Sequence, residues 1–398
     1  MAEDLRVAFF PDAFHETNGV ARTSRALVEA ASRRHVPLLR VNAGPLTRWE
    51  GGLNPRIELA RGPVSFALER DLRYDLLLWR HCRRVVETVR AFTADLVHVT
   101  GPSDVGQLGA YVAHTLRLPL VASWHTNLHE YAAQRAAPWL RRVPGLSLEG
   151  RKILQLVERS TLSAVLRFYR LADVLLAPNM ELVELLRRRL GKPTFLMRRG
   201  VDTTMFSPAK RDARDGVFRL GFAGRLSVEK NVRLLARLER GLLAAGHRAF
   251  RFVIVGDGQE RAWLEQHLQQ AEFTGVLHGE ALARAYANMD LFVFPSETDT
   301  FGNVVQEALA SGTPALVSNA GGPKFVVRPG ASGFVASAER EFIECACAAI
   351  DDRERHARMR VAARRQAMGA SWDRVFDEVL EAYAAAGGRM SAREATAS

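Results

Sequence analysis

Short apolar segments alternate with helical patterns along most of this 398-residue chain, and this alternation constrains the fold more than any other feature. In the first half, strands are predicted at residues 5–10, 38–41, 96–99, 120–123, 173–177 and 195–197. Helices are predicted between them, at 20–34, 74–91, 105–116 and 180–190. Such a strand–helix–strand rhythm predicts a parallel sheet with helices on both faces.

The rhythm breaks at 130–172, resumes, and breaks again before the second half of the chain. Residues 198–216 are rich in turn formers and charges, so we interpret them as a linker. The second alternation predicts strands at 218–222, 251–255, 273–276 and 291–294, and helices at 231–245, 260–268 and 281–288. One hydrophobic core rarely serves a chain of this length, so we expect an α/β protein with two doubly wound domains, at 1–197 and 217–370.

The end of the chain is predicted to be helical and then disordered. Helices are expected within 339–368, and the pattern SWDRVFDEVLEAYAAA predicts an amphipathic helix at 371–386. Residues 387–398 are small and polar, so we expect a disordered tail there.

The cysteine count and the hydropathy exclude several classes of protein. Only Cys82, Cys345 and Cys347 occur, without metal-site partners, so a disulfide or zinc framework is excluded and buried thiols are expected. No apolar run reaches the roughly 18 residues of a membrane span. The start MAEDLRVAFF enters a strand directly instead of forming a signal peptide. We therefore expect a cytoplasmic protein.

The net charge of +11 is confined to the first half, where residues 1–200 carry 30 Lys and Arg against 19 Asp and Glu. Residues 130–172 are basic and interleaved with Trp, Leu, Phe and Tyr. Such a segment suits the surface of an anionic membrane, or alternatively nucleic acid. It could also be an ordinary helix with its apolar stripe on a core and its arginines in water.

The stretch 292–312, FVFPSETDTFGNVVQEALASG, places acids around a strand-to-helix turn. Glu297 and Asp299 lie in the turn, Phe301 and Gly302 follow, and Glu307 stands eight positions beyond Asp299. Backbone N–H groups at 302–305 would favour a phosphate or a sugar oxygen. Alternatively, a polar residue of 296–300 simply caps the helix, and the acids are solvated.

Three more loops follow predicted strand ends, where ligands of parallel sheets bind. Gly19 precedes a helix and could approach a phosphate, although a lone glycine is also a common turn. His125 could donate to a ligand or be structural. Arg225 and Lys230, in AGRLSVEKN, could converge on a diphosphate or form a loop salt-bridged through Glu229.

In this order and spacing, these motifs closely resemble the retaining glycosyltransferases of family 4, which have the GT-B fold. The similarity extends over residues 7–383. The segments FPDAFHETNGV, RGVDTTMFSP, GDGQERAWLE and SETDTFGNVVQEALASG are most similar to the branch of GDP-mannose-dependent α-mannosyltransferases and of sulfoquinovosyl and glucosyl transferases acting on diacylglycerol lipids. The resemblance implies two Rossmann-like domains facing a cleft. The first binds the acceptor and is joined by helix 371–386, and the second binds the nucleotide sugar.

The resemblance also implies a role for each residue. His125 would hydrogen-bond the transferred sugar, Arg225 and Lys230 would hold the diphosphate, and Asp299 would contact sugar hydroxyls; these four are the candidate catalytic residues. Further donor contacts are implied for Gly19, Phe301, Gly302, Asn303, Val304 and Glu307. The family usually has Glu where Asp299 stands, and many relatives have an acid after the glycines of 320–324, where this chain has Pro323 and Lys324.

The implied reaction is metal-independent hexosyl transfer with retention, without a cofactor other than the donor substrate. The donor would be GDP-mannose, or alternatively a UDP-sugar used for glucosyl or sulfoquinovosyl transfer to diacylglycerol. The acceptor would be a membrane lipid or glycolipid, reached by peripheral contact of 130–172 with the inner face of the cytoplasmic membrane. A nucleic-acid-binding protein is the alternative of another class, but no recognised binding module is present.

Overall fold

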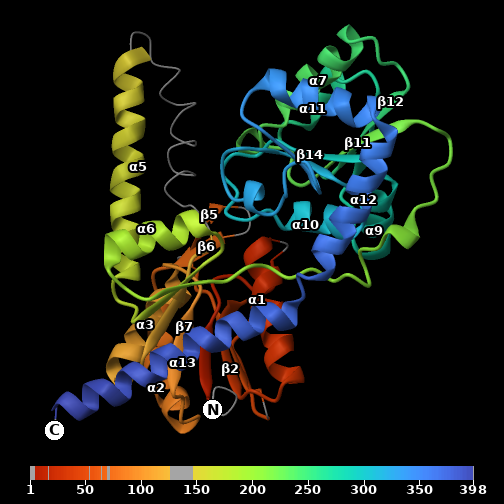
Figure 1. Ribbon diagram of the computed structural model, residues 1–398. Helices are drawn as coiled ribbons and strands as arrows, with labels where there is room; N and C mark the ends of the chain where they lie inside the picture. Colours follow the sequence, from red (N-terminus) through yellow and green to blue (C-terminus); the bar gives the residue numbers. More distant parts are fainter. Residues whose placement is uncertain are drawn as a thin grey trace. The chain divides into compact units, whose positions relative to one another are not determined.

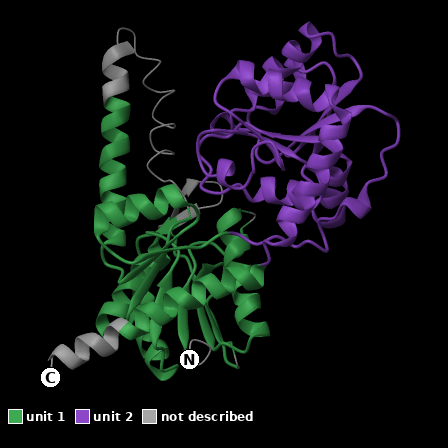
Figure 2. Ribbon diagram, viewed as in Figure 1, with its two compact units in different colours: residues 1–198, 372–398 green, residues 199–371 purple. Residues whose placement is uncertain are grey.

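The computed structural model describes residues 5–16, 18–52, 54–63, 65–69, 72–125 and 147–397. The chain divides into two compact units (Figure 2). Unit 1 comprises Met1–Arg198 and Trp372–Ser398, and unit 2 comprises Arg199–Ser371. Part of the basic segment predicted at 130–172, residues 130–146, lies outside the described residues.

The sheet of unit 1 has the strand order β10-β9-β8-β7-β1-β2-β4-β3 among the described residues. Its strands pair in parallel except β3, which is antiparallel to β4. The strands are β1 (Val7–Phe10), β2 (Leu38–Gly44), β3 (Arg48–Glu50), β4 (Arg56–Ala60), β7 (Leu96–Val99), β8 (Leu120–Ser123), β9 (Val174–Ala177) and β10 (Thr194–Leu196). A separate hairpin is formed by β5 (Ser65–Glu69) and β6 (Leu72–Asp75).

Helices cover both faces of this sheet because successive strand residues point to opposite sides. Val7 and Phe9 belong to a core shared with α1 and α13, whereas Ala8 and Phe10 belong to a core shared with α2 and α3. The helices of unit 1 are α1 (Gly19–Arg33), α2 (Cys82–Ala91), α3 (Asp104–Leu116), α5 (Ser147–Tyr169), α6 (Met180–Leu190) and α13 (Trp372–Ala397).

The region between β2 and α2 differs from its prediction. The helix predicted at 74–91 is wrong in its first part, since a strand, a turn and a short 3-10 helix (Leu78–His81) precede α2. The buried carboxylate of Asp75 accepts the N–H groups of Gly62 and Leu77 at 2.6 and 2.8 Å. These bonds fix a turn where the apolar spacing alone indicated a helix, and strands β3 to β6 were not predicted.

The last helix, α13, returns to unit 1 and crosses its sheet beside α1 (Figure 1). Val375, Phe376, Val379 and Tyr383 are buried there, as the amphipathic pattern predicted. Helix α13 continues to Ala397, into the residues predicted as a disordered tail. The two glycines at 387 and 388 each disfavour a helix by only about 1 kcal/mol, and residues with good helix propensity follow them.

Unit 2 is a second parallel sheet with helices on both faces, which confirms the expected fold class. Its strand order is β13-β12-β11-β14-β15-β16. The strands are β11 (Phe218–Ala223), β12 (Phe250–Val255), β13 (Ala271–Gly275), β14 (Leu291–Phe294), β15 (Ala315–Ser318) and β16 (Gly333–Ala336). The helices are α7 (Arg233–Ala244), α8 (Arg261–His267), α9 (Gly279–Asn288), α10 (Asn303–Ala310), α11 (Glu339–Asp351) and α12 (Arg353–Met368).

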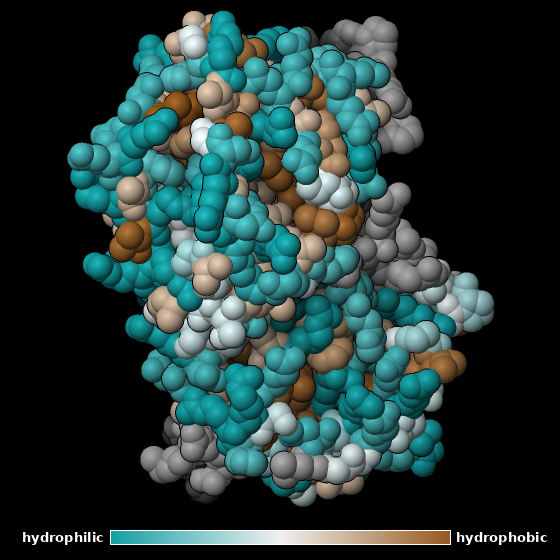
Figure 3. Space-filling view, turned by 90° about the vertical axis from the view of Figure 1, so that its right-hand side faces the viewer, coloured by the Kyte–Doolittle hydropathy of each residue, from teal (hydrophilic) through white to brown (hydrophobic). Residues whose placement is uncertain are grey.

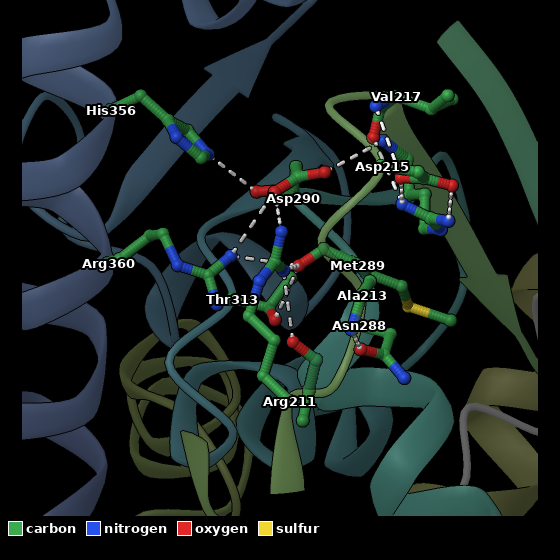
Figure 4. Close-up of polar contacts among 12 residues, drawn as sticks. Arg211, Ala213, Asp215, Val217, Asn288, Met289, Asp290, Thr313, His356 and Arg360 are labelled. Carbon is green, nitrogen blue, oxygen red and sulfur yellow. Dashed lines mark hydrogen bonds and ion pairs between the residues drawn. The ribbon is translucent and has the colours of Figure 1, made fainter. Parts of the chain in front are cut away.

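A charged cluster around Asp290 fastens the segment before β11 to unit 2 (Figure 4). Asp290 directly precedes β14 and is only 7% exposed. Its carboxylate lies 2.7 Å from Arg211 Nη2 and 3.7 Å from Arg360 Nη1, and it accepts the N–H of Arg219 at 2.9 Å. Its backbone carbonyl accepts a hydrogen bond from His356. The segment interpreted as a linker therefore packs on unit 2.

On the face shown in Figure 3, hydrophilic residues predominate and apolar ones form small separate patches. Across the described residues, no helix is long and apolar enough to span a bilayer. Cys82, Cys345 and Cys347 are only partly buried, in contrast to the prediction, because they lie on helices near the surface.

Replacement of Asp290 by alanine should destabilise unit 2 by about 2 to 3 kcal/mol, because the partly buried Arg211 and Arg360 would lose their acid and the N–H of Arg219 its acceptor. Urea denaturation followed by circular dichroism measures this change. The control is Glu87→Ala, whose exposed pair with Arg83 should contribute less than about 1 kcal/mol. A loss below about 1 kcal/mol for Asp290→Ala would contradict the role given to this cluster.

Candidate functional site

Three loops of unit 2 meet at the carboxyl ends of neighbouring strands. Strands β11, β14 and β15 lie side by side and are parallel, so the chain leaves all three at the same edge of the sheet. Residues 224–230 follow β11, residues 295–302 follow β14, and residues 319–322 follow β15. The predicted residues Arg225, Lys230 and Asp299 therefore share one edge.

Lys230 and Asp299 form a close ion pair at this edge. Lys230 Nζ lies 2.7 Å from both carboxylate oxygens of Asp299, and the two side chains are 10% and 22% exposed. Lys230 is also near the ring of Phe294, at 5.7 Å from its centroid. Lys230 and Asp299 were expected to contact different groups of a ligand, diphosphate and sugar, but in the structure they contact each other. The pair thus holds both side chains in place at the edge of the sheet.

Arg225 lies on the same loop and is more exposed than Lys230. Its side chain is 45% exposed, and a terminal guanidinium nitrogen lies 3.9 Å from Glu229 Oε1. An ion pair of this length between partly exposed groups contributes little stability. The loop salt bridge that the sequence left as an alternative does form, but its length leaves the guanidinium able to turn toward an anion.

Helix α10 begins at this edge without a side-chain cap. Its N-cap residue is Gly302, with φ 95°, and no side chain caps the helix through a hydrogen bond. The capping alternative is therefore wrong. Unpaired N–H groups of a helix start attract anions and polar oxygens, and the predicted Asn303 and Val304 form the first turn. Phe301 is 8% exposed and belongs to the core of unit 2.

The glycines after β15 bring the third loop against the second. The N–H of Gly322 donates to the carbonyl oxygen of Asp299 at 2.6 Å. A Cβ atom on Gly322 would clash with the backbone of Thr300, so only glycine permits this approach. The segment 320–324 therefore supports the backbone that carries Asp299.

Several buried polar atoms around this edge fit a polar ligand. Ser227 Oγ, Thr298 Oγ1 and Asn303 Oδ1 are buried and have no hydrogen-bond partner among the described residues. Buried polar groups are almost always paired, so such a group of atoms indicates a ligand rich in hydroxyl or phosphate oxygens. Glu307 lies one turn into α10 and is 2% exposed.

In unit 1, Gly19 is the first residue of α1. Asn18 caps this helix, since its Oδ1 accepts the N–H of Ala21 at 2.9 Å. Arg25 donates to the carbonyl oxygen of Phe14 at 2.5 Å, so its guanidinium links helix α1 to the loop after β1. The loop that carries Gly19 is thus held in place by local bonds.

His125 follows β8 by two residues and is 8% exposed. Its Nε2 lies 2.7 Å from Ser123 Oγ. Trp124, between them, points to the opposite face and stacks on Tyr169 with ring centroids 4.9 Å apart. The imidazole is therefore held at the carboxyl end of the unit 1 sheet, where it was predicted.

Asp12, in the loop after β1, was not predicted to be a site residue. Ser103 Oγ donates to its carboxylate at 2.6 Å, and Asp104 and Arg61 lie nearby. Burial raises the pKa of Asp12 to about 7, with Asp104 adding to the increase and Ser103 and Arg61 opposing it. The signal that could have found it is an acid directly after a strand end.

A second groove in unit 2 does not include any of the predicted site residues. It has a volume of about 620 Å³ and is lined by residues near the amino ends of the strands, among them Arg219, Glu272 and Arg284. Its charges are mixed and its position is away from the three loops. Across the described chain, no three His, Cys, Asp or Glu side chains gather as metal ligands would.

Comparison with known proteins identifies the class of this protein. Residues 17–205 match the family model described as Glycosyltransferase Family 4, and residues 217–352 match that described as Glycosyl transferases group 1. The chain is 35% identical to a GDP-mannose-dependent alpha-mannosyltransferase of Mycobacterium tuberculosis over 322 residues, covering 78% of each protein. The chain therefore belongs to glycosyltransferase family 4. It is an enzyme that transfers a sugar from a nucleotide-sugar donor.

The chain is also similar to another curated transferase and to a solved structure. The sulfoquinovosyl transferase SQD2 of Arabidopsis thaliana is 29% identical over 63% of this chain and 48% of that protein. The structure of sucrose-phosphate synthase from Thermosynechococcus elongatus superposes with a TM-score of 0.68 at 19% identity, covering 99% of this chain and all of that one. The second similarity supports the two-unit fold alone.

Asp12 should make the protein less stable as the pH rises from about 4 to 7. In that window the folded state holds a proton that the unfolded state, with its pKa near 3.8, has lost. The variant Asp12→Asn keeps an acceptor for Ser103, so it should exceed the wild type by about 2 kcal/mol at pH 8 and equal it near pH 4.

Urea denaturation at both pH values measures this difference. The control is Asp373→Asn, whose carboxylate is 62% exposed and should leave the pH dependence unchanged. Equal stability of Asp12→Asn and the wild type at pH 8 would show that Asp12 is ionised at no cost to the fold.

Proposed function

We propose that this enzyme transfers mannose from GDP-mannose, with retention of anomeric configuration, to a hydroxyl group of a membrane lipid or glycolipid. The observation that carries the proposal is the edge of unit 2 where Arg225, the Lys230–Asp299 pair and the uncapped start of α10 occur together. Cations and free N–H groups suit a diphosphate, and a carboxylate suits sugar hydroxyls. The 35% identical relative supports the choice of GDP-mannose.

The ion pair gives both charged groups a role in donor binding. Asp299 accepts hydroxyl groups of the sugar, and Lys230, released toward the diphosphate, adds its positive charge there. Arg225 approaches the same phosphates through its long and weakly held side chain. Glu307 binds the ribose, and the amides of residues 301–304 bind sugar and phosphate oxygens.

The reaction breaks the bond between the sugar C1 and a phosphate oxygen and forms one between C1 and the acceptor oxygen. Negative charge develops on the leaving nucleotide, so Arg225 and Lys230 stabilise the transition state more than the bound donor. The acceptor proton passes to the leaving phosphate, and no protein base is required for this transfer. His125 donates a hydrogen bond to the sugar and holds its orientation.

A membrane acceptor is favoured by the surface of α5. This helix spans Ser147–Tyr169 and projects from the sheet of unit 1 (Figure 1). Ile153 and Leu156 are 38% and 64% exposed on it, and the first 200 residues carry the excess of basic side chains. Exposed apolar residues among basic ones suit an anionic lipid surface.

Donor binding and turnover test the proposed reaction. GDP-mannose should raise the melting temperature more than UDP-glucose or UDP-galactose, because tight binding stabilises the folded state. The variant Arg225→Ala should fold normally and lose about 100- to 1000-fold in kcat/KM for mannosyl transfer. A preference for a UDP-sugar would favour the alternative, diacylglycerol glucosyl or sulfoquinovosyl transfer, which the similarity to SQD2 raises.

The two acids of the turn provide a matched pair of variants. Asp299→Asn should abolish turnover because it removes the charge beside Lys230, whereas Glu297→Gln should be nearly neutral, since that side chain is exposed. Loss of activity in Glu297→Gln with activity retained in Asp299→Asn would overturn the assignment of the donor acid.

Co-sedimentation with vesicles tests the membrane acceptor. The protein should bind vesicles that contain phosphatidylglycerol more tightly than phosphatidylcholine vesicles, and 0.5 M salt should weaken this binding about tenfold or more because it screens surface charges. Leu156→Glu should reduce binding. Its control is Val361→Glu on α12, at a residue of similar exposure, 60%. Equal binding to both kinds of vesicle would contradict the proposed surface.

A further inference from the structure

Four buried polar side chains form a continuous line through unit 1. Tyr383 OH, on α13, lies 2.7 Å from His98 Nδ1, on β7. His98 Nε2 lies 3.0 Å from Ser123 Oγ, on β8, which in turn lies 2.7 Å from His125 Nε2. These residues are 2%, 0%, 1% and 8% exposed, in that order. The line links the last helix of the chain to the imidazole at the carboxyl edge of the sheet.

The alternation of the strands brings these groups together. On β7, Leu96 points into the core beside α13 and Val97 points away, so His98 faces α13. On β8, Val121 points to α13 and Ala122 away, so Ser123 also faces α13. The rest of that core is largely apolar. Polar groups in such surroundings must satisfy one another.

The direction of the hydrogen bonds follows from the tyrosine. Among the described residues, His98 is the hydrogen-bond partner of the Tyr383 hydroxyl. If the hydroxyl accepted a hydrogen bond from His98 Nδ1–H, its own proton would be buried without an acceptor, which costs about 1 to 3 kcal/mol. The hydroxyl therefore donates, and His98 Nδ1 accepts.

The remaining protons are then determined in turn. Burial lowers the pKa of His98 to about 3, so its ring is neutral and carries its proton on Nε2. That N–H donates to Ser123 Oγ, and the Ser123 hydroxyl donates to His125 Nε2. Burial also raises the pKa of Tyr383, which keeps the first donor of the line protonated.

We propose that Tyr383, His98 and Ser123 are positioning residues that fix His125 as the tautomer with its proton on Nδ1. In this form, Nε2 accepts the hydrogen bond of the Ser123 hydroxyl, and the proton of the ring is on Nδ1. The proposal deepens the proposed function and rests on it only for the ligand of His125, the transferred sugar. The tautomer itself is a property of the protein alone.

The same line disfavours protonation of His125. An imidazolium would donate from Nε2 to Ser123 Oγ, so His125 could no longer accept the Ser123 proton. Either that proton loses its acceptor, or both bonds beyond it reverse and the Tyr383 proton loses its acceptor. Helix α13 therefore does more than cover the sheet. It supplies the first hydrogen-bond donor of the line, the hydroxyl of Tyr383, which is 285 residues from His98 in sequence.

Nitrogen-15 NMR of the full chain labelled at histidine tests the proposal without substrate. Signals are assigned with His98→Gln and His125→Gln. At pH 7.5, the wild type should show His125 protonated on Nδ1 and His98 protonated on Nε2. Tyr383→Phe should shift both rings toward a mixture of tautomers and lower kcat/KM for sugar transfer about tenfold, the worth of one hydrogen bond.

The matched control is Tyr169→Phe. It removes another buried tyrosine hydroxyl, which donates to the backbone oxygen of Ser123 at 3.1 Å but is not in the line. It should cost similar stability, leave both ring tautomers unchanged and keep kcat/KM within about twofold. A histidine signal that changes in Tyr383→Phe and not in Tyr169→Phe separates positioning from general loss of stability.

Three outcomes would overturn the proposal: an Nε2-protonated His125 in the wild type, unchanged rings in Tyr383→Phe, or a changed tautomer in Tyr383→Phe with unchanged kcat/KM. Failure of the proposed function is distinguishable from these. A wild type with the expected ring signals that transfers no sugar from any nucleotide-sugar donor tested would remove that function and support the fixed tautomer.

Discussion

Every candidate residue of this enzyme depends on the parallel pairing of its strands. In a parallel sheet, each strand leaves at the same edge, so loops that are far apart in sequence are brought together there. In unit 2 this places Arg225, Lys230 and Asp299 on neighbouring loops, since β11 and β14 are adjacent although about 70 residues separate them in sequence. In unit 1 it places His125 beside the loop regions of β1 and β7.

The charges at the unit 2 edge hold one another in a state suited to a donor. A buried lysine without a partner would destabilise the fold, and Asp299 supplies that partner. In the proposed function, the donor replaces this pair with contacts of its own, phosphate to Lys230 and sugar hydroxyls to Asp299. The nearby buried oxygens of Ser227, Thr298 and Asn303 suit the same kind of ligand.

Unit 1 is completed by the end of the chain. Helix α13 buries Val375, Phe376 and Val379 against the sheet and places Tyr383 next to His98. An unpaired polar group in a largely apolar core costs free energy. Every member of the line is paired only if the hydrogen bonds all run in one direction, from Tyr383 to His125. The packing of one amphipathic helix and the chemistry of one imidazole are therefore connected.

The sequence alone determined the two parallel-sheet units, most strand positions and the strand ends that carry the site residues, because apolar periodicity and turn residues are local signals. It missed the hairpin of β5 and β6 and the late start of α2, where the buried carboxylate of Asp75 overrides the apolar spacing. Only the tertiary structure decided that Lys230 meets Asp299, that Asp12 is buried beside Ser103, and that Tyr383 reaches His98. Each of these depends on which strands and helices become neighbours, and long-range packing sets that.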